Sequence, residues 1–338
     1  MPPPAPLRTL ERRDHHVRRI PVLALMTHSR CNCRCLMYDI WKGNRAGASL
    51  SMGLVERLVG ELRELGVEEI LLSGGEPMMH ADLWSLCAVL KTMPVRITLL
   101  STGLLLARHA EAVTRWCDEV IVSLDGSEAV HDAIRGVPRT FARLAEGVGA
   151  LRAIRSGFPV SGRCVLQKRN FRDLANIVTA AHSIGLDRIS FLTADLSSTA
   201  FNRPAAWDDG HTAEICLDAD ESGEFLDLIE ALIRERASDF ASGFIVERPE
   251  RLRQLGHYYL AVQGLRPFPP IRCAAPWLST VIEVDGTVRP CFFHAPIGNI
   301  HSDNLEAILN SENAVAFRRN LDMRRDPICS RCVCTFNL

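Results

Sequence analysis

Short apolar runs alternate with longer amphipathic stretches from residue 21 to about residue 195. In the longer stretches, apolar residues recur every three or four positions, which predicts helices with one buried face. The short runs are rich in Val, Ile and Leu, which predicts buried strands. The predicted strands are Val22 to Thr27, Glu69 to Ser73, Arg96 to Ser101, Val120 to Leu124, Val160 to Gln167 and Arg188 to Leu192. The predicted helices are Met52 to Leu65, Asp82 to Met93, Leu105 to Trp116, Thr140 to Ser156 and Arg172 to Ile184.

This alternation is typical of repeated βα units around a parallel sheet. A sheet built from such units either opens into a doubly wound sheet or curves into a barrel. Both arrangements bring the loops that follow the strands together at one end of the sheet. Functional residues are therefore expected directly after each predicted strand.

The regular pattern ends after Phe201, where a polar stretch containing Pro and Asp begins. One helix is then predicted near Glu224 to Arg236. A proline-rich segment leads into a hairpin that turns at Asp285 and Gly286, because Asp-Gly is a favoured pair in tight turns. The expected segments are a basic tail over 1–20, a barrel over 21–205, a linker or lid over 206–267 and a small domain over 268–338.

Composition narrows the class of protein. The 338 residues are 47% hydrophobic, which is enough to bury a large core. A net charge of −1 creates no general attraction for nucleic acid or anionic lipid, so we expect a small-molecule or peptide partner. No run approaches the roughly eighteen apolar residues of a membrane span, and the N-terminus has no apolar signal-peptide core. We expect a cytoplasmic protein that binds neither membrane nor nucleic acid.

The chain has twelve cysteines, and a reducing compartment removes the usual reason for so many, which is disulfide bonding. Metal ligation is the next explanation, and the cysteines favour it because most of them lie in two groups. The N-terminal group is Cys31, Cys33 and Cys35, and the C-terminal group is Cys273, Cys291, Cys329, Cys332 and Cys334. Outside these groups, Cys87, Cys117 and Cys164 lie singly in predicted helices or strands, where buried thiols are expected.

The sequence SRCNCRCLMYDIWK directly follows the first predicted strand. Thiolates crowded into one loop can surround a single compact metal centre. Cys31, Cys35 and position 38 have the spacing CxxxCxxC, and here the chain resembles the radical S-adenosylmethionine superfamily. The resemblance implies a [4Fe-4S] cluster held by three cysteines, with one iron open to the amino and carboxylate groups of S-adenosylmethionine. Position 38 departs from the pattern, because it is Tyr38.

The next three strand ends extend the resemblance, with the sequences LLSGGEP, LLSTG and VSLDGSEAVHDAIRG. Glycines allow close backbone approach, and a carboxylate can accept a ligand ammonium group. By resemblance, Glu76 binds the amino group of the cofactor, Ser123 contacts its ribose and Arg135 contacts its carboxylate. The other cofactor residues that the resemblance implies are Met37, Gly74, Gly75, Pro77, Ser101 and Thr102.

The C-terminal cysteines form a second motif. Cys273, Cys291, Cys329 and Cys332, with the stretches CAAPW, VDGTVRPC and IGNI, resemble the auxiliary-cluster module called twitch, a shortened SPASM domain. The resemblance implies a second [4Fe-4S] cluster held by these four cysteines, and it leaves Cys334 as a spare or alternate ligand. A structural zinc site is the alternative, since four cysteines with a CxxC suit tetrahedral zinc. Zinc leaves the motifs between the cysteines unexplained.

These resemblances imply an α/β fold in which a partial (β/α)6 TIM-like barrel precedes a twitch domain. They also imply an enzyme that cleaves S-adenosylmethionine to a 5′-deoxyadenosyl radical, which abstracts hydrogen from a substrate. A flavodoxin or ferredoxin would donate the electron. We expect a small polyhydroxylated substrate, such as a sugar, aminocyclitol or nucleoside, to be dehydrogenated or epimerised in natural-product biosynthesis.

Two features favour a small substrate over a peptide. The sequence has no extra N-terminal domain of the kind that captures leader peptides, and the polar stretch FLTADLSSTAFNR ends the sixth strand. A peptide-modifying maturase and a relative without catalytic activity are the alternatives. The candidate substrate contacts are Asp195, Ser197, Ser198, Asn202 and Arg203.

Three explanations of Tyr38 are open: an engineered or accidental change from cysteine, a natural loss of radical chemistry, and a working cluster that uses Tyr38 or Cys33 as its third ligand. A phenol is a much poorer ligand for a soft iron-sulfide centre than a thiolate, because its ordinary pKa is about 10. We therefore expect this chain to assemble its N-terminal cluster poorly and to cleave S-adenosylmethionine slowly or not at all.

Overall fold

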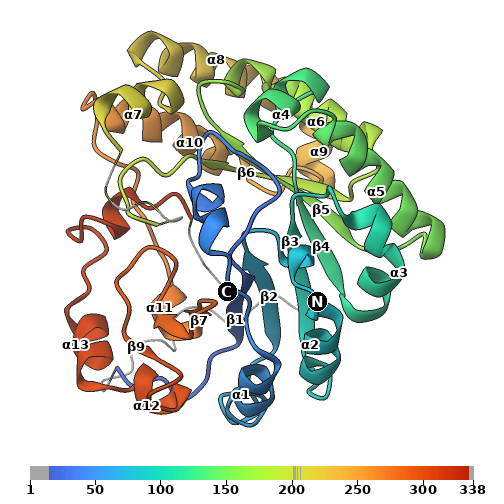
Figure 1. Cartoon of the computed structure of the whole chain (residues 1–338). Helices are drawn as coiled ribbons and strands as arrows, with labels where there is room; N and C mark the ends of the chain where they lie inside the picture. The colour runs from blue at the N-terminus through green and yellow to red at the C-terminus, as the bar shows by residue number, and fades with distance from the viewer. Residues whose placement is uncertain (1–14, 201–202, 204, 206, 335–338) are drawn as a thin grey trace.

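The computed structural model describes residues 15–200, 203, 205 and 207–334. Six parallel strands lie side by side in chain order and form the partial (β/α)6 barrel that the sequence predicts (Figure 1). Every predicted strand is present within one residue of its expected bounds at each end. The strands are β1 (Val22–His28), β2 (Glu69–Gly74), β3 (Arg96–Ser101), β4 (Glu119–Ser123), β5 (Val160–Leu166) and β6 (Arg188–Thr193).

Helices follow the strands and cover the outer face of the sheet (Figure 1). All five predicted helices are present. The sequence did not predict α4 (Glu128–Arg135), because eight residues are too few to establish a clear apolar period. The predicted helices are α1 (Met52–Glu64), α2 (Leu83–Leu90), α3 (Leu106–Trp116), α5 (Thr140–Ile154) and α6 (Leu174–Ser183). Short 3-10 helices are η2 (Ile40–Ala46), η3 (Pro77–Met79), η4 (Phe171–Asp173) and η5 (Cys329–Arg331).

Helix α1 shows how the local sequence sets these elements. Ser51 caps its N-terminus, because the serine hydroxyl accepts a hydrogen bond from the backbone N–H of Leu54 at 3.3 Å. Its buried face consists of Leu54, Val55, Leu58 and Leu62. Burial of one such side chain stabilises the fold by roughly 1.5 to 3 kcal/mol, so this stripe holds the helix in place.

The segment after the barrel contains four helices where the sequence predicts one. They are α7 (Asp209–Ile215), α8 (Ala219–Glu235), α9 (Ala237–Ser242) and α10 (Pro249–Val262). Helix α10 packs against α8 and β6. Its Tyr259 hydroxyl donates a hydrogen bond to the carbonyl of Leu166 at 2.5 Å and accepts one from the N–H of Ala194 at 3.2 Å. These contacts tie α10 to the ends of β5 and β6.

The C-terminal segment continues the same sheet on its other side. Strand β7 (Ser279–Ile282) pairs in parallel with β1, beginning at Val22 opposite Ser279. Strands β8 (Thr287–Arg289) and β9 (Gly298–Asn299) add antiparallel pairs, so the sheet order is β6-β5-β4-β3-β2-β1-β7-β8-β9. The predicted hairpin turn is confirmed, and Gly286 adopts a φ of +82°, which favours glycine. The remaining helices are α11 (Ala275–Leu278), α12 (Leu305–Leu309) and α13 (Glu312–Asn320).

One hydrophobic core joins the barrel to the C-terminal segment. It runs from residues of β1, such as Leu23 and Leu25, to Ile282 and Val288 of the C-terminal hairpin. Cys87, Cys117 and Cys164 lie in this core, as the sequence predicts. Within the described ranges, no helix combines the length and the apolar character that crossing a membrane requires.

Candidate active site

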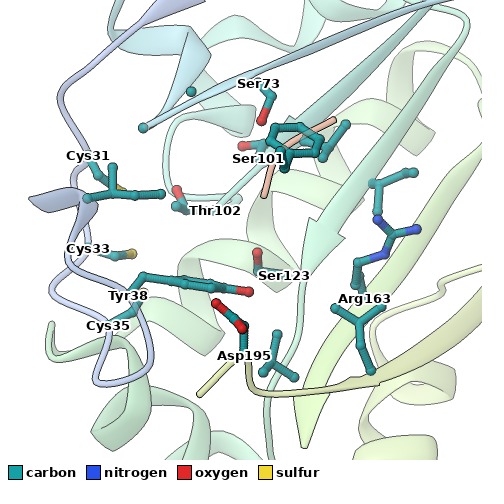
Figure 2. A pocket seen from close by; sticks show the side chains of 18 of the residues that line it. Cys31, Cys33, Cys35, Tyr38, Ser73, Ser101, Thr102, Ser123, Arg163 and Asp195 are labelled. Carbon is teal, nitrogen blue, oxygen red and sulfur yellow. The ribbon is translucent and has the colours of Figure 1, made fainter. Parts of the chain in front are cut away.

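A cavity of about 210 Å³ lies at the C-terminal ends of the barrel strands (Figure 2). It is lined mainly by residues that follow or end β1 to β6, together with residues of the C-terminal segment. The fold therefore brings the predicted strand-end residues to one place. The predicted site residues in its lining are Cys31, Cys35, Tyr38, Gly74, Gly75, Ser101, Thr102, Ser123, Arg135 and Asp195.

Hydrogen bonds to the backbone of the cysteine loop hold the loop in place. The side chain of Asn44 accepts a hydrogen bond from the N–H of Cys31 and donates one to the carbonyl of Cys31, both at 2.9 Å. The N–H of Arg34 donates to the carbonyl of Arg135 at 2.8 Å, which fixes the loop against α4. Gly75 lies so close that a Cβ there would be 2.0 Å from the carbonyl oxygen of Arg30, so only glycine fits. These contacts fix the loop against Asn44, α4 and the Gly74–Gly75 turn.

The three thiols of this loop differ in their protonation. A hydrogen bond from the Cys33 thiol, together with the Arg135 guanidinium, lowers the pKa of Cys35 to about 7 despite its burial. Arg135 Nη1 donates to Cys35 Sγ at 3.5 Å. Burial raises the pKa of Cys31 to about 12. Cys35 is thus the thiol readiest to ligate, and metal binding must displace protons from the other thiols.

Tyr38 shares the cavity with these thiols, and Figure 2 shows its ring extending away from the cysteines towards Ser123 and Asp195. Burial, reinforced by the nearby Asp125 carboxylate, raises the pKa of Tyr38 above its ordinary value. Its phenol therefore stays neutral and is a poor ligand for an iron-sulfur cluster. The donor set fits a cluster through Cys31 and Cys35, with Cys33 as a third thiol in the same cavity.

Glu76 is fully buried directly behind the cavity wall. Its carboxylate accepts hydrogen bonds from the Thr102 backbone N–H and hydroxyl, both at 2.7 Å, and from the Ser101 hydroxyl at 3.1 Å. Burial raises the pKa of this carboxyl, while these donors oppose the shift. Ser101 and Thr102, which the resemblance places at the cofactor ribose, thus orient Glu76 as well as lining the cavity. Pro77 is buried beside it at the start of η3.

Arg135 is already paired inside the protein. Its Nη2 lies 2.5 Å from Oδ2 of Asp125, and both side chains are buried. Asp125, two residues after the end of β4 in the quoted motif, was not among the predicted site residues. Through its ion pair with Asp125 and its contact with Cys35, Arg135 holds the cysteine loop against α4.

The predicted substrate contacts form a network among themselves. Oδ2 of Asp195 lies 2.9 Å from Nη1 of the buried Arg203 and also accepts a hydrogen bond from the Ser198 hydroxyl. The N–H of Ser197 donates to Asp195 at 3.3 Å. Of this group only Asp195 lines the main cavity, and Arg203 lines an adjoining cavity of about 400 Å³. Asn202 lies outside the described residues.

Met37 does not reach the cavity. Its side chain is fully buried in the core, and its carbonyl accepts a hydrogen bond from Arg203 Nη2 at 3.3 Å. Its position in the cysteine loop is therefore structural in this fold. The resemblance had implied a cofactor contact at this residue.

Several lining residues escaped the sequence analysis. Arg163 lies on β5, and Phe292, Phe293, Val333 and Cys334 come from the C-terminal segment. Arg163 carried a signal, because it is the one charged residue in the strand VSGRCVL. Cys334 was predicted only as a spare or alternate cluster ligand, and the others carried no signal, since their approach to the cavity depends on the pairing of β7 with β1.

The C-terminal cysteines gather beside this cavity. Burial raises the pKa of Cys332, and the nearby Cys334, Cys273 and Cys291 thiols raise it further. His294 Nε2 lies 3.2 Å from Cys329 Sγ. The arrangement therefore provides a thiol-rich group for a metal centre.

The spacing of ligand atoms favours a cluster over a single zinc ion. With Zn–S bonds of about 2.3 Å, tetrahedral zinc holds its sulfurs roughly 3.8 Å apart. Across the described ranges, only His294, Asp326 and Cys329 bring three potential ligand atoms within 4.8 Å of one another. No three cysteine sulfurs in the described ranges therefore lie within 4.8 Å of one another.

The chain is similar in sequence or in fold to several known proteins. The AdoMet-dependent heme synthase of Methanosarcina barkeri is 28% identical over 46% of this chain and 45% of its own length, so that match spans less than half of the relative. The probable GTP 3′,8-cyclase of Methanothermobacter thermautotrophicus is 24% identical over 86% of this chain and 88% of its own length. A crystal structure of Streptococcus suis SuiB bound to S-adenosylmethionine shares the fold, with a TM-score of 0.65, 13% identity and coverage of 95% and 74% of the two chains.

Two families match separate parts of the sequence. Residues 25–181 match the radical SAM superfamily, and residues 273–333 match SPASM, an iron-sulfur cluster-binding domain. These matches imply S-adenosylmethionine and [4Fe-4S] clusters as cofactors. The first match covers the cysteine loop and the strand ends around the cavity, and the second covers Cys273, Cys291, Cys329 and Cys332. The chain therefore belongs to the radical SAM superfamily and carries a C-terminal SPASM domain.

Proposed function

We propose that this chain has the site of an enzyme that binds S-adenosylmethionine in the 210 Å³ cavity and removes a hydrogen atom from an organic substrate beside it, an activity that Tyr38 impairs. When bound, the cluster and cofactor supply a 5′-deoxyadenosyl radical. The observation that carries the proposal is the convergence of Cys31, Cys35, Thr102, Ser123 and Arg135 from separate strand ends on one cavity.

The protein's own contribution is binding, orientation and exclusion of water. Glu76 would accept the cofactor ammonium group, with Thr102 fixing the direction of its carboxylate. The Cys33 thiol and the Arg135 guanidinium would favour the ionised form of Cys35, which is the form that ligates iron. Apolar side chains such as Val165 and Phe292 line the cavity and would keep water from a reactive radical.

The proposed substrate class is a small polyhydroxylated molecule, which would be dehydrogenated or epimerised in natural-product biosynthesis. Asp195 is the candidate contact on the cavity wall, although Arg203 and Ser198 already engage its carboxylate. A peptide substrate is the competing outcome. A reduced flavodoxin or ferredoxin is the proposed electron donor, and a reducing compartment such as the cytoplasm is the proposed location.

Replacing Glu76 with glutamine tests the cofactor site. Glutamine keeps the shape and one acceptor oxygen for Thr102 but removes the charge. We expect the affinity for S-adenosylmethionine to fall by about tenfold or more, since charge-assisted hydrogen bonds contribute roughly 1.5 to 3 kcal/mol. Equilibrium dialysis of anaerobic protein measures this. Glu111→Gln, on the exposed face of α3, is the matched control, and equal affinity in Glu76→Gln and the parent would refute the assigned role.

Replacing Asp195 with asparagine separates the substrate wall from the cofactor site. The change strips Arg203 of its buried counter-ion, which should lower the free energy of unfolding by about 3 kcal/mol or more. Affinity for S-adenosylmethionine should stay within about twofold, a change of less than 0.5 kcal/mol. Chemical denaturation and dialysis measure the two effects. Glu224→Gln, which breaks the exposed pair with Arg172, should change stability little. A large loss of cofactor affinity in Asp195→Asn would place Asp195 in the cofactor site instead.

A further inference from the structure

We propose that the substrate of this cavity carries an anionic group, a carboxylate or phosphate, and that Arg163 binds it. The inference rests on the proposed function, because it takes the cavity as the substrate site. It adds the charge of the substrate and names the residue that selects it.

Arg163 is a cationic side chain in the middle of a barrel strand. It lies on β5, opposite Ser123 of β4 and Ser190 of β6. Its side chain lines the cavity, as Figure 2 shows. Its Nε donates a hydrogen bond to the Ser190 hydroxyl at 3.4 Å. Among the residues that the structure describes, no carboxylate oxygen lies within the 4.0 Å of an ion pair with Arg163.

The other arginines that line the two cavities are each paired with a carboxylate. Arg135 is paired with Asp125 at 2.5 Å, Arg203 with Asp195 at 2.9 Å, and Arg289 with Glu283 at 2.7 Å. Their charges are therefore balanced within the protein. Among the described residues that line these two cavities, Arg163 is the guanidinium without a carboxylate in ion-pair contact.

Glu247, an acid whose pKa responds to Arg163, is engaged elsewhere. Glu247 is engaged by the backbone N–H of Phe191 at 2.9 Å. Burial raises the pKa of Glu247 to about 7, and the charges of Arg163 and Arg251 only partly oppose that shift. Near neutral pH this carboxyl is partly protonated, so it balances only part of the Arg163 charge.

The chemistry of the site favours an anion as the missing partner. A guanidinium presents a planar fork of donors that matches carboxylate or phosphate oxygens. Apolar neighbours such as Val165, Leu192 and Phe292 lower the local dielectric, which strengthens such a pair. A substrate anion would therefore be both held and oriented by Arg163.

S-adenosylmethionine also has a carboxylate, but its expected place is elsewhere. If the cofactor's amino and carboxylate groups meet the open iron, they lie next to the cysteine loop. In Figure 2, Arg163 lies across the cavity from Cys31, Cys33 and Cys35. The same cavity is also lined by Phe292, Val333 and Cys334 of the C-terminal segment. Arg163 thus faces the side of the cavity where a substrate would lie between cofactor and SPASM domain.

The test uses anaerobically purified full-length protein and three probes. S-adenosylmethionine reports the cofactor site, 3-phenylpropionate supplies a carboxylate with a ring for the apolar lining, and 3-phenylpropionamide is its uncharged match. Dissociation constants are measured by equilibrium dialysis for the parent, Arg163→Gln, Arg163→Lys and Arg289→Gln. Arg289→Gln is the control, because it removes a guanidinium that Glu283 already balances.

We expect the parent to prefer the carboxylate over the amide and Arg163→Gln to lose about tenfold in carboxylate affinity, as for a charge-assisted hydrogen bond. Arg163→Lys should retain part of it, since lysine keeps the charge without the fork. S-adenosylmethionine affinity should stay within about twofold in all variants.

Three results would overturn the proposal: no preference of the parent for the carboxylate, an equal loss in Arg289→Gln, or a loss of S-adenosylmethionine affinity in Arg163→Gln as large as that for the carboxylate. The third result assigns Arg163 to the cofactor's own carboxylate. If S-adenosylmethionine does not bind the parent at all, the proposed function fails, while the carboxylate and amide comparison still decides the role of Arg163.

Discussion

Replacing Tyr38 with cysteine should add about four iron atoms per chain, the content of one [4Fe-4S] cluster, and should start S-adenosylmethionine cleavage. The reason is the donor at position 38. The buried Tyr38 phenol stays neutral, whereas a cysteine there completes the CxxxCxxC pattern with Cys31 and Cys35. Of the other predicted cofactor residues, Gly74, Gly75, Ser101, Thr102, Ser123 and Arg135 already line the cavity, and Glu76 is buried behind its wall. Iron and sulfide analysis and 5′-deoxyadenosine formation after reduction with dithionite measure the two effects.

Cys33 provides the control for this experiment. In the Tyr38→Cys protein, a further Cys33→Ala change should leave iron content and cleavage nearly unchanged. In the parent, Cys33→Ala should remove little, because little cluster is expected there. Robust cleavage by the parent that disappears in Cys33→Ala would show instead that Cys33 is a working third ligand. Cys33 lines the same cavity as Cys31 and Cys35, so the structure permits that outcome.

Replacing Cys332 with alanine should remove about four iron atoms from the SPASM domain, with matching sulfide. It should also loosen the chain after β8, because metal ligation supplies much of the folding free energy of so small a segment. Strand β7 should stay protected, since its hydrogen bonds to β1 do not depend on the cluster. Metal analysis and hydrogen exchange measure these effects.

Cys216→Ala is the matched control, because Cys216 is a buried cysteine outside both groups. It should leave iron content unchanged. The interpretation would be wrong if the parent held stoichiometric zinc and no iron in this domain. Cys329→Ala should reproduce the effect of Cys332→Ala, and His294, 3.2 Å from Cys329, should then lose its sulfur neighbour.

The strands and the cofactor motifs could be predicted because their signals are local. A buried strand is a short apolar run, and a strand-end motif such as LLSGGEP lies within a few residues. The same local reasoning missed α4, whose eight residues carry Arg135, and the three extra helices after the barrel.

The remaining differences depend on contacts between distant residues. Asp195 and Arg203 were expected to face a substrate, but in the structure they form an ion pair with each other. This pairing depends on the path of the loop after β6, which the local sequence does not reveal. Phe292 reaches the cavity only because β7 pairs with β1. Arg163 could have been noticed as a charge within an apolar strand, yet its lack of a carboxylate partner among the described residues is visible only in three dimensions.

The pairing of β7 with β1 also sets the order in which the molecule can be completed. During synthesis, β1 emerges early, but the neighbour on its outer side emerges only with Ser279 to Ile282. Until then, the backbone N–H and C=O groups along that side of β1 are unpaired and can template association with another chain. The SPASM domain is therefore also the cover that closes the sheet edge of the barrel. Removing the SPASM domain would leave one edge of β1 unpaired, and β1 leads into the cysteine loop. The barrel alone would therefore be a poor unit for domain exchange between proteins.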